Sequence, residues 1–187
     1  MRLDTAIVAG MFGHGAFLRG MNLGGRRITN DDLRAAVREL GFERVQTFRA
    51  SGNVVFDGGG RSDESLRKEL ERGLQRLLGY AVPTFIRSRR ELLALAEEEP
   101  FPASGEAGKL QVALLRDVPA PQDREQVMAL SSESDRLAFG AKELFWLPAG
   151  PISDSALDWK AIEKALGPTT TRTKGTIEQL VAKYLQD

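Results

Sequence analysis

The chain has 187 residues, of which 42% are hydrophobic and 28% are charged, and its 26 basic and 26 acidic side chains give no formal net charge. These values are typical of a soluble globular protein that is long enough for one large domain or two small ones. A neutral chain has no overall field that attracts nucleic acid or an anionic membrane, so binding of either one requires a local basic patch.

The side chains on which many catalytic and metal sites depend are scarce. The chain has no cysteine and one histidine, His14, which excludes disulfides, thiolate zinc sites, cysteine nucleophiles and histidine-based metal clusters. No stretch approaches the roughly 18 consecutive apolar residues of a membrane-spanning helix. The mildly apolar start contains Asp4 and has no clear cleavage site, so we do not expect a signal peptide. The composition predicts a cytoplasmic protein with no metal site and no membrane partner.

The hydrophobic spacing of the first half predicts the order strand, helix, strand, strand, helix, strand. The first helix is expected to have Thr29 as its N-cap, with Asp32 three residues later, and to end at Gly41. A further helix is expected after Ser88, which forms a capping box with Glu91. The expected bounds are a strand at 16–18, a helix at about 30–40, strands at 44–48 and 53–56, a helix over 66–78 and a strand at 82–86.

The second half repeats this order and ends in one more helix. The expected bounds are a strand at 110–115, a helix at 122–130, strands at 136–139 and 144–147, a helix at 156–166 and a strand at 169–173. Thr176 with Gln179 is expected to cap the terminal helix.

A break between the halves is expected at residues 100–108, which read PFPASGEAG and suit neither a helix nor a central strand. This linker separates a first α+β subdomain at 1–99 from a second at 109–187. The repeated order predicts an α+β protein with two tandem ferredoxin-like β-α-β-β-α-β subdomains, related by duplication, and a C-terminal helix.

The main candidate for a binding site is the segment LRGMNLGGRR at residues 18–27. Its arginine forks and the backbone of Gly24 and Gly25 suit a phosphate or a carboxylate. However, Asp31 and Asp32 open the following helix and already occupy the positive end of its dipole. The segment also lacks the Lys-Ser/Thr of a P-loop. The alternative is a tight strand-to-helix turn in which Arg19 pairs with a carboxylate.

Two further segments carry polar groups that could extend this site. Ser51, Gly52 and Asn53 are typical of a hairpin turn, and they lie beside the Arg19 loop if the first and third strands pair. A nucleophilic role for Ser51 needs a nearby base, so a turn or a ligand contact is favoured. Arg172 lies in a run of threonines and cations that either completes an anion site from the other half or forms an edge strand.

The segments FLRGMNLGG at 17–25, SGNVVF at 51–56 and TTR at 170–172 resemble the bacterial family of domain of unknown function 1697. The spacing of the three segments matches, so the resemblance covers residues 14–187. It implies two α+β subdomains related by duplication, and it implies no substrate, cofactor or reaction. The family usually continues after the last segment with Asn and an aromatic or similar residue, where this chain has Thr173 and Lys174.

Three functions remain open. The first is binding of a small anion, either a phosphorylated metabolite or a nucleotide; the second is an enzyme that acts on such a metabolite in the same pocket, with its catalytic residues unassigned. The third is weak binding of single-stranded nucleic acid, suggested by the fold class alone. The sequence points to no particular cofactor. The expected ligand-binding residues are Arg19, Asn22, Gly24, Gly25, Ser51, Gly52, Asn53 and Arg172.

Overall fold

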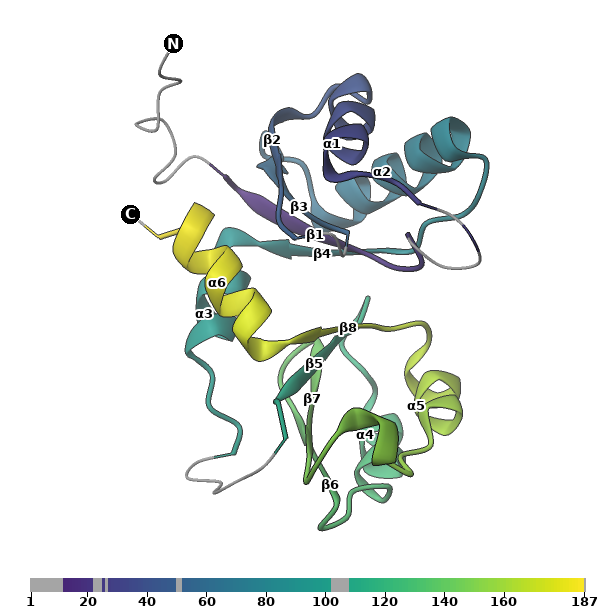
Figure 1. Cartoon of the computed structure of the whole chain (residues 1–187). Coiled ribbons are helices and arrows are strands. Elements are labelled where there is room, and N and C mark those ends of the chain that lie inside the picture. The colour runs from purple at the N-terminus through teal and green to yellow at the C-terminus, as the bar shows by residue number, and fades with distance from the viewer. Residues whose placement is uncertain (1–11, 22–24, 26, 50–51, 102–107, 187) are drawn as a thin grey trace. The chain divides into compact units, whose positions relative to one another are not determined.

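The protein is seen here in a computed structural model that describes residues 12–21, 25, 27–49, 52–101 and 108–186 (Figure 1). The chain forms two compact units, Met1–Ala96 with Glu178–Asp187, and Glu97–Ile177. The expected subdomains at 1–99 and 109–187 stay a prediction, and in the structure the last ten residues belong to the first unit.

The first unit contains a four-stranded antiparallel sheet with the strand order β2-β3-β1-β4. The expected strand at 82–86 lies two residues later, as β4, and Pro83 precedes it because proline has no N–H to donate to the sheet. The elements of this unit are β1 (His14–Leu18), α1 (Asn30–Glu39), β2 (Glu43–Thr47), β3 (Asn53–Asp57), α2 (Asp63–Leu78), β4 (Thr84–Ser88), α3 (Arg89–Glu97) and the end of α6 (Lys174–Tyr184).

Helices α1 and α2 pack on one face of this sheet and bury a hydrophobic core (Figure 1). The Thr29 cap of α1 is confirmed, since its hydroxyl accepts a hydrogen bond from the Asp32 N–H at 3.1 Å. The core joins alternate residues of the strands to the apolar stripes of the helices, including Ala16, Leu18, Val54, Phe56, Leu33, Val37, Leu66, Leu70 and Leu74.

Helix α3 lies against the other face of the same sheet. A Cβ built on Gly15 would stand 2.7 Å from Cδ1 of Leu92, so a larger residue at this position would require the Leu92 side chain to shift. The capping box that starts α3 is confirmed, because the Ser88 N–H donates to the Glu91 carboxylate at 2.7 Å. The Glu91 N–H in turn donates to the Ser88 hydroxyl at 3.3 Å.

The second unit has its own antiparallel sheet, with the strand order β6-β7-β5-β8. Helices α4 and α5 cover one face over a core that includes Leu144, Trp146 and Ile162. The elements are β5 (Gln111–Leu114), α4 (Pro121–Met128), β6 (Asp135–Phe139), β7 (Glu143–Pro148), a 3-10 turn (Ile152–Asp154), α5 (Trp159–Leu166), β8 (Thr170–Thr173) and the start of α6.

Two expected helix starts in this unit are wrong. Helix α5 begins at Trp159 rather than 156, because the Asp158 carboxylate accepts from the Ala161 N–H and caps it there. Helix α6 begins at Lys174, and Thr173 caps it by accepting from the Thr176 N–H at 3.2 Å. Thr176 therefore lies inside the helix that it was expected to cap.

The α+β class is confirmed, with helices packed on two four-stranded antiparallel sheets. Each unit has the order β-α-β-β-α-β, and its first strand lies between its third and fourth, an arrangement consistent with the ferredoxin-like fold. Across the described residues, every helix is too short or too polar to span a bilayer.

Candidate functional site

The loop that follows β1 and the turn between β2 and β3 lie against each other in the first unit. Strands β1 and β3 pair with Phe17 opposite Asn53, and the Leu18 N–H donates to the Gly52 carbonyl at 2.8 Å. Gly52 has a φ of +70°, and a Cβ on it would stand 3.1 Å from Leu18 and from the Met21 side chain. Only glycine fits both the backbone conformation and this contact. The structure thus brings together the two segments singled out in the sequence.

Arg19 is the first residue beyond β1 and is anchored through its backbone. Its N–H donates to the Pro83 carbonyl at 2.9 Å, which ties the loop to the start of β4, and its side chain is partly exposed. The next residue, Gly20, has a φ of +75°, and Gly25 has a φ of +82°. The predicted ligand residues Asn22 and Gly24 lie outside the described residues.

Asn53 supports the β2–β3 turn with its side chain. Its Nδ2 donates to the Phe48 carbonyl at 2.9 Å, and the Phe48 N–H donates to the Asn53 carbonyl, also at 2.9 Å. The residue is fully buried. The side-chain amide therefore closes the turn, which makes Asn53 a positioning residue rather than an exposed donor. Ser51, between these residues, lies outside the described part of the chain.

Arg49 is a cation in the same turn that the sequence analysis missed. Its φ is +55°, a left-handed backbone that side chains other than glycine, asparagine and aspartate rarely adopt. The side chain is exposed, donates to the Oε1 of Gln179 on α6, and has its guanidinium carbon 5.5 Å from the centre of the Phe48 ring. Arginine is not a typical turn residue, so the sequence carried no signal for this conformation.

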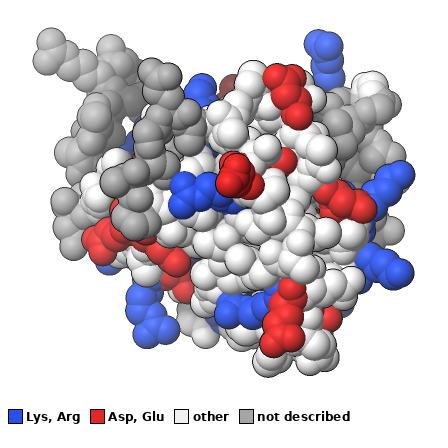
Figure 2. All heavy atoms as spheres, turned by 90° about the horizontal axis from the view of Figure 1, so that it is seen from below, with Lys and Arg blue, Asp and Glu red and all other residues white. Residues whose placement is uncertain are grey.

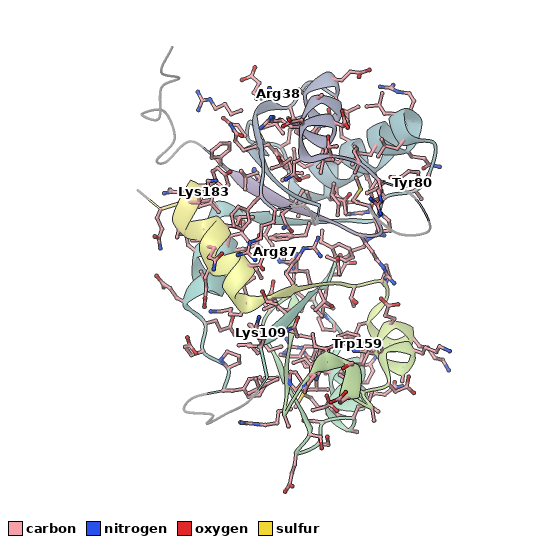
Figure 3. The ribbon with its side chains drawn as sticks, in the orientation of Figure 1. Arg38, Tyr80, Arg87, Lys109, Trp159 and Lys183 are labelled. Atoms are coloured by element: carbon pink, nitrogen blue, oxygen red, sulfur yellow. The ribbon has the colours of Figure 1, made fainter. Side chains whose placement is uncertain are left out.

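Residues at the C-terminal end of α6 contact the β2–β3 turn. The Tyr184 hydroxyl donates to the Thr47 carbonyl at 3.3 Å, and the rings of Tyr184 and Phe48 meet edge to face at 6.2 Å. Lys183, labelled in Figure 3, has its Nζ 5.9 Å from the Phe48 ring and 5.1 Å from the Tyr184 ring. Two cations therefore lie close to one half-buried phenylalanine.

Arg172 belongs to the second unit, where it lies on β8 opposite Val112. Its Nη1 donates at 2.9 Å to the Thr170 hydroxyl and to the Thr171 carbonyl. Burial lowers the pKa of Arg172 to about 10, so the guanidinium stays cationic at neutral pH. The expected strand around it is present as β8, and its expected role beside Arg19 stays a prediction.

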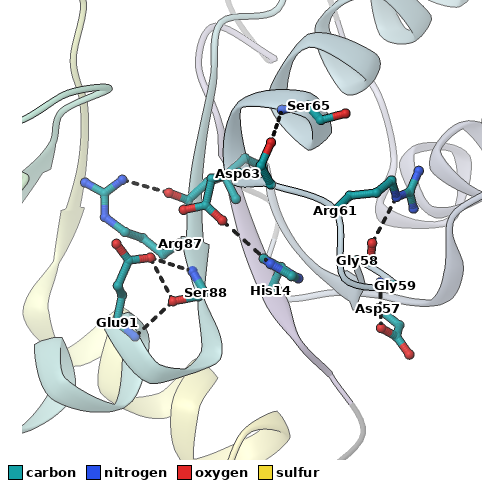
Figure 4. Close-up of polar contacts among 12 residues, drawn as sticks. His14, Asp57, Gly58, Gly59, Arg61, Asp63, Ser65, Arg87, Ser88 and Glu91 are labelled. Carbon is teal, nitrogen blue, oxygen red and sulfur yellow. Dashed lines mark hydrogen bonds and ion pairs between the residues drawn. The ribbon is translucent and has the colours of Figure 1, made fainter.

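His14 forms a second polar cluster in the first unit, at the start of α2 (Figure 4). Its Nε2 lies 3.6 Å from the Asp63 carboxylate, and its ring stacks on Phe56 with centres 5.9 Å apart. Burial lowers the pKa of His14 below 6.5, while the charges of Asp63, Asp57 and Glu91 oppose this shift.

The chemistry open to His14 is limited by what surrounds its two nitrogens. Nδ1 is buried against Gly58 and has no hydrogen-bond partner among the described residues. Nε2 lies 3.6 Å from an oxygen of the Asp63 carboxylate. The arrangement is that of a neutral histidine packed into the sheet, and it presents no free base to the loop that carries Arg19. Within the described ranges, no three His, Asp or Glu side chains gather closely enough to hold a metal ion.

The fold has a counterpart among solved structures. The conserved bacterial protein SP0830 from Streptococcus pneumoniae is similar over 92% of this chain and 99% of its own, with a TM-score of 0.74 and 21% sequence identity. At that identity, the likeness concerns the fold alone. A comparison with curated proteins finds no match. Residues 11–145, most of the chain, match the family described as Protein of unknown function (DUF1697), and the chain therefore belongs to that family.

Proposed function

We propose that the protein binds a small anion, a phosphorylated metabolite or a nucleotide, beside the loop after β1 and the β2–β3 turn. The observation that carries the proposal is the contact of Gly52 with Leu18, because it sets the turn against the loop that begins with Arg19. Proteins commonly bind phosphate and carboxylate groups with arginine guanidinium groups and with the backbone N–H groups of glycines that have a positive φ. Asn22, Gly24 and Ser51 remain predicted contacts of this site.

The charges around the two segments support an anion over a cation as the ligand. Arg19, Arg27 and Arg49 all belong to them, and each is at least partly exposed. The first acidic residues after the loop, Asp31 and Asp32, are engaged within α1, by Arg34 and Thr29 respectively. Within the two segments themselves, the described charged side chains are therefore basic, although the whole chain is neutral.

Fewer observations support the two alternative functions, an enzyme and a protein that binds single-stranded nucleic acid. An enzyme in the same pocket needs a general base, and the only histidine is held against Asp63 and Gly58. Binding of single-stranded nucleic acid needs a basic surface with exposed aromatic rings. On the face in Figure 2, the basic and acidic side chains that are described alternate, and neither sign forms a continuous patch. Turnover distinguishes the first alternative, and steep salt dependence distinguishes the second.

We infer that the two units arose by duplication, since both have the same element order and the same strand order. We also place the protein in the cytoplasm, on the argument that a chain without cysteine needs no oxidising compartment.

The test is a thermal-shift screen of the full chain with inorganic phosphate, pyrophosphate, ATP, citrate and a short single-stranded RNA, each at low and high salt. A ligand at 100 times its Kd adds about 2.7 kcal/mol to the stability of the folded state, which raises Tm by several degrees. We expect a salt-tolerant shift with a small phosphate compound. A screen in which no anion shifts Tm contradicts the proposal, and a shift by RNA alone that vanishes at high salt supports the nucleic-acid alternative.

A further inference from the structure

The turn between β2 and β3 holds a cation in a strained backbone. Arg49 has a φ of +55°, and such left-handed conformations of ordinary residues cluster at binding sites, where the surrounding structure imposes them. A glycine at this position would adopt the same backbone without the steric cost, as Gly52 does three residues later with a φ of +70°. Among the described residues, Arg44 is the other non-glycine residue with such a backbone, and its guanidinium lies 4.0 Å from the Asp57 carboxylate.

The contacts of Arg49 within the described part of the chain do not include an acidic partner. Its hydrogen-bond partner is the neutral amide oxygen of Gln179, and its side chain is exposed. Neither Arg49 nor Lys183 forms an ion pair with a carboxylate in the described part of the chain, although both lie over the Phe48 ring. Two cations held over one ring without a counter-ion leave this part of the turn positive.

The position of Arg49 relates it to the site proposed above. The turn that begins at Phe48 closes through Asn53, and its other end, Gly52, packs against Leu18 beside Arg19. Gln179 and Tyr184 of α6 fix the Arg49 end of this turn, through the Arg49 guanidinium and the Thr47 carbonyl. The turn is thus held at both ends, and α6 holds the arginine side chain in place before any ligand arrives.

From this we infer that Arg49 contacts the bound anion, as a second cation of the site that Arg19 begins. The inference rests on the proposed function and makes the ligand one with two anionic groups or more, such as a diphosphate. The Arg49 guanidinium would exchange its bond to the Gln179 amide for a charge-assisted bond to the ligand.

The experiment uses pyrophosphate, titrated calorimetrically into the full chain and its variants. The central variant is R49G, and the matched control is R44G. Arg44 also has a left-handed backbone, with a φ of +51°, but it lies at the other end of β2, where its guanidinium is 4.0 Å from Asp57. Both variants remove an exposed arginine and relieve the same kind of strain. Only one of them removes the proposed ligand contact.

We expect R49G to weaken pyrophosphate binding at least tenfold and R44G to leave it within twofold of wild type. R49K, which keeps the charge, should retain part of the affinity. R49G that binds as tightly as wild type overturns the inference while leaving the anion site in place. A Tm of R49G far below that of R44G also overturns the inference, because it would show that Arg49 stabilises the fold. A wild-type chain that binds no anion contradicts the proposed function itself.

Discussion

Gly52 lies so close to Leu18 that a Cβ built on the glycine would stand 3.1 Å from both the Cβ and the carbonyl oxygen of the leucine. The same glycine accepts the Leu18 N–H at 2.8 Å. One residue therefore provides both a backbone bond and a packing contact between two segments that lie 34 positions apart in the sequence. The candidate site depends on this contact.

Substitution of Gly52 by alanine should destabilise the protein by roughly 2 to 4 kcal/mol. The new methyl group would be strained by the φ of +70° and would crowd Leu18 and Met21. Urea unfolding measures the change. Gly59→Ala is the matched control, because Gly59 has a φ of +59° but no atom within 4 Å of its would-be Cβ. We expect Gly59→Ala to cost about 1 kcal/mol. Equal costs for the two variants would show that the contact with Leu18 contributes nothing.

Substitution of Asn53 should loosen the turn. Asn53→Ala leaves the Phe48 carbonyl without its side-chain donor and should cost about 1 to 3 kcal/mol of stability. Asn53→Asp should cost more at neutral pH, because a buried carboxylate would then face that carbonyl oxygen. Protonation of the new carboxyl restores a donor, so the stability gap between Asn53→Asp and Asn53→Ala should shrink at acidic pH. If the stability difference between Asn53→Asp and Asn53→Ala does not change with pH, the Asn53 side chain does not donate to the Phe48 carbonyl.

The stability of the first unit should depend on pH through His14. Burial lowers the pKa of His14 in the folded state, so the unfolded chain binds a proton more readily. The stabilising contribution is therefore fully present above the ordinary pKa of 6.5 and is lost as the pH falls towards the lower pKa of the folded state. His14→Gln removes the titrating group while keeping a donor for Asp63.

Urea unfolding of wild type and His14→Gln across this pH range measures the effect. We expect the wild type to lose stability relative to the variant as the pH falls. The opposite trend, a wild type that gains stability relative to His14→Gln, would mean that the charge of Asp63 outweighs burial and that the pKa is raised.

Much of the fold follows from local patterns in the sequence. The Thr29 cap and the Ser88–Glu91 capping box depend on residues three positions apart, so spacing alone reveals them. The first residue of α6 was harder to predict, because both Thr173 and Thr176 are suitable N-cap residues. Thr173 has this role since β8 ends there, and the extent of a strand depends on its pairing with β5.

The grouping of the last ten residues, which include the end of α6, with the first unit had no local signal. The apolar residues of α6 predict an amphipathic helix equally well for either unit, and the bonds from Arg49 to Gln179 and from Tyr184 to Thr47 join residues more than 120 positions apart. The candidate site shows the same division. The glycine-rich segments stood out as turns, whereas the burial of Asn53 and the left-handed backbone of Arg49 depend on neighbours that only the folded chain supplies.

The most direct test of the anion site is a calorimetric titration of wild type, Arg19→Ala and Arg76→Ala with the phosphate compound that gives the largest shift in the screen. Arg76 is an exposed arginine in the last turn of α2 and serves as the control for loss of one positive charge. Loss of a charge-assisted hydrogen bond should weaken binding roughly 10- to 100-fold in Arg19→Ala. Arg76→Ala should bind as wild type does. Equal Kd values for wild type and Arg19→Ala, with both proteins folded, would contradict the account.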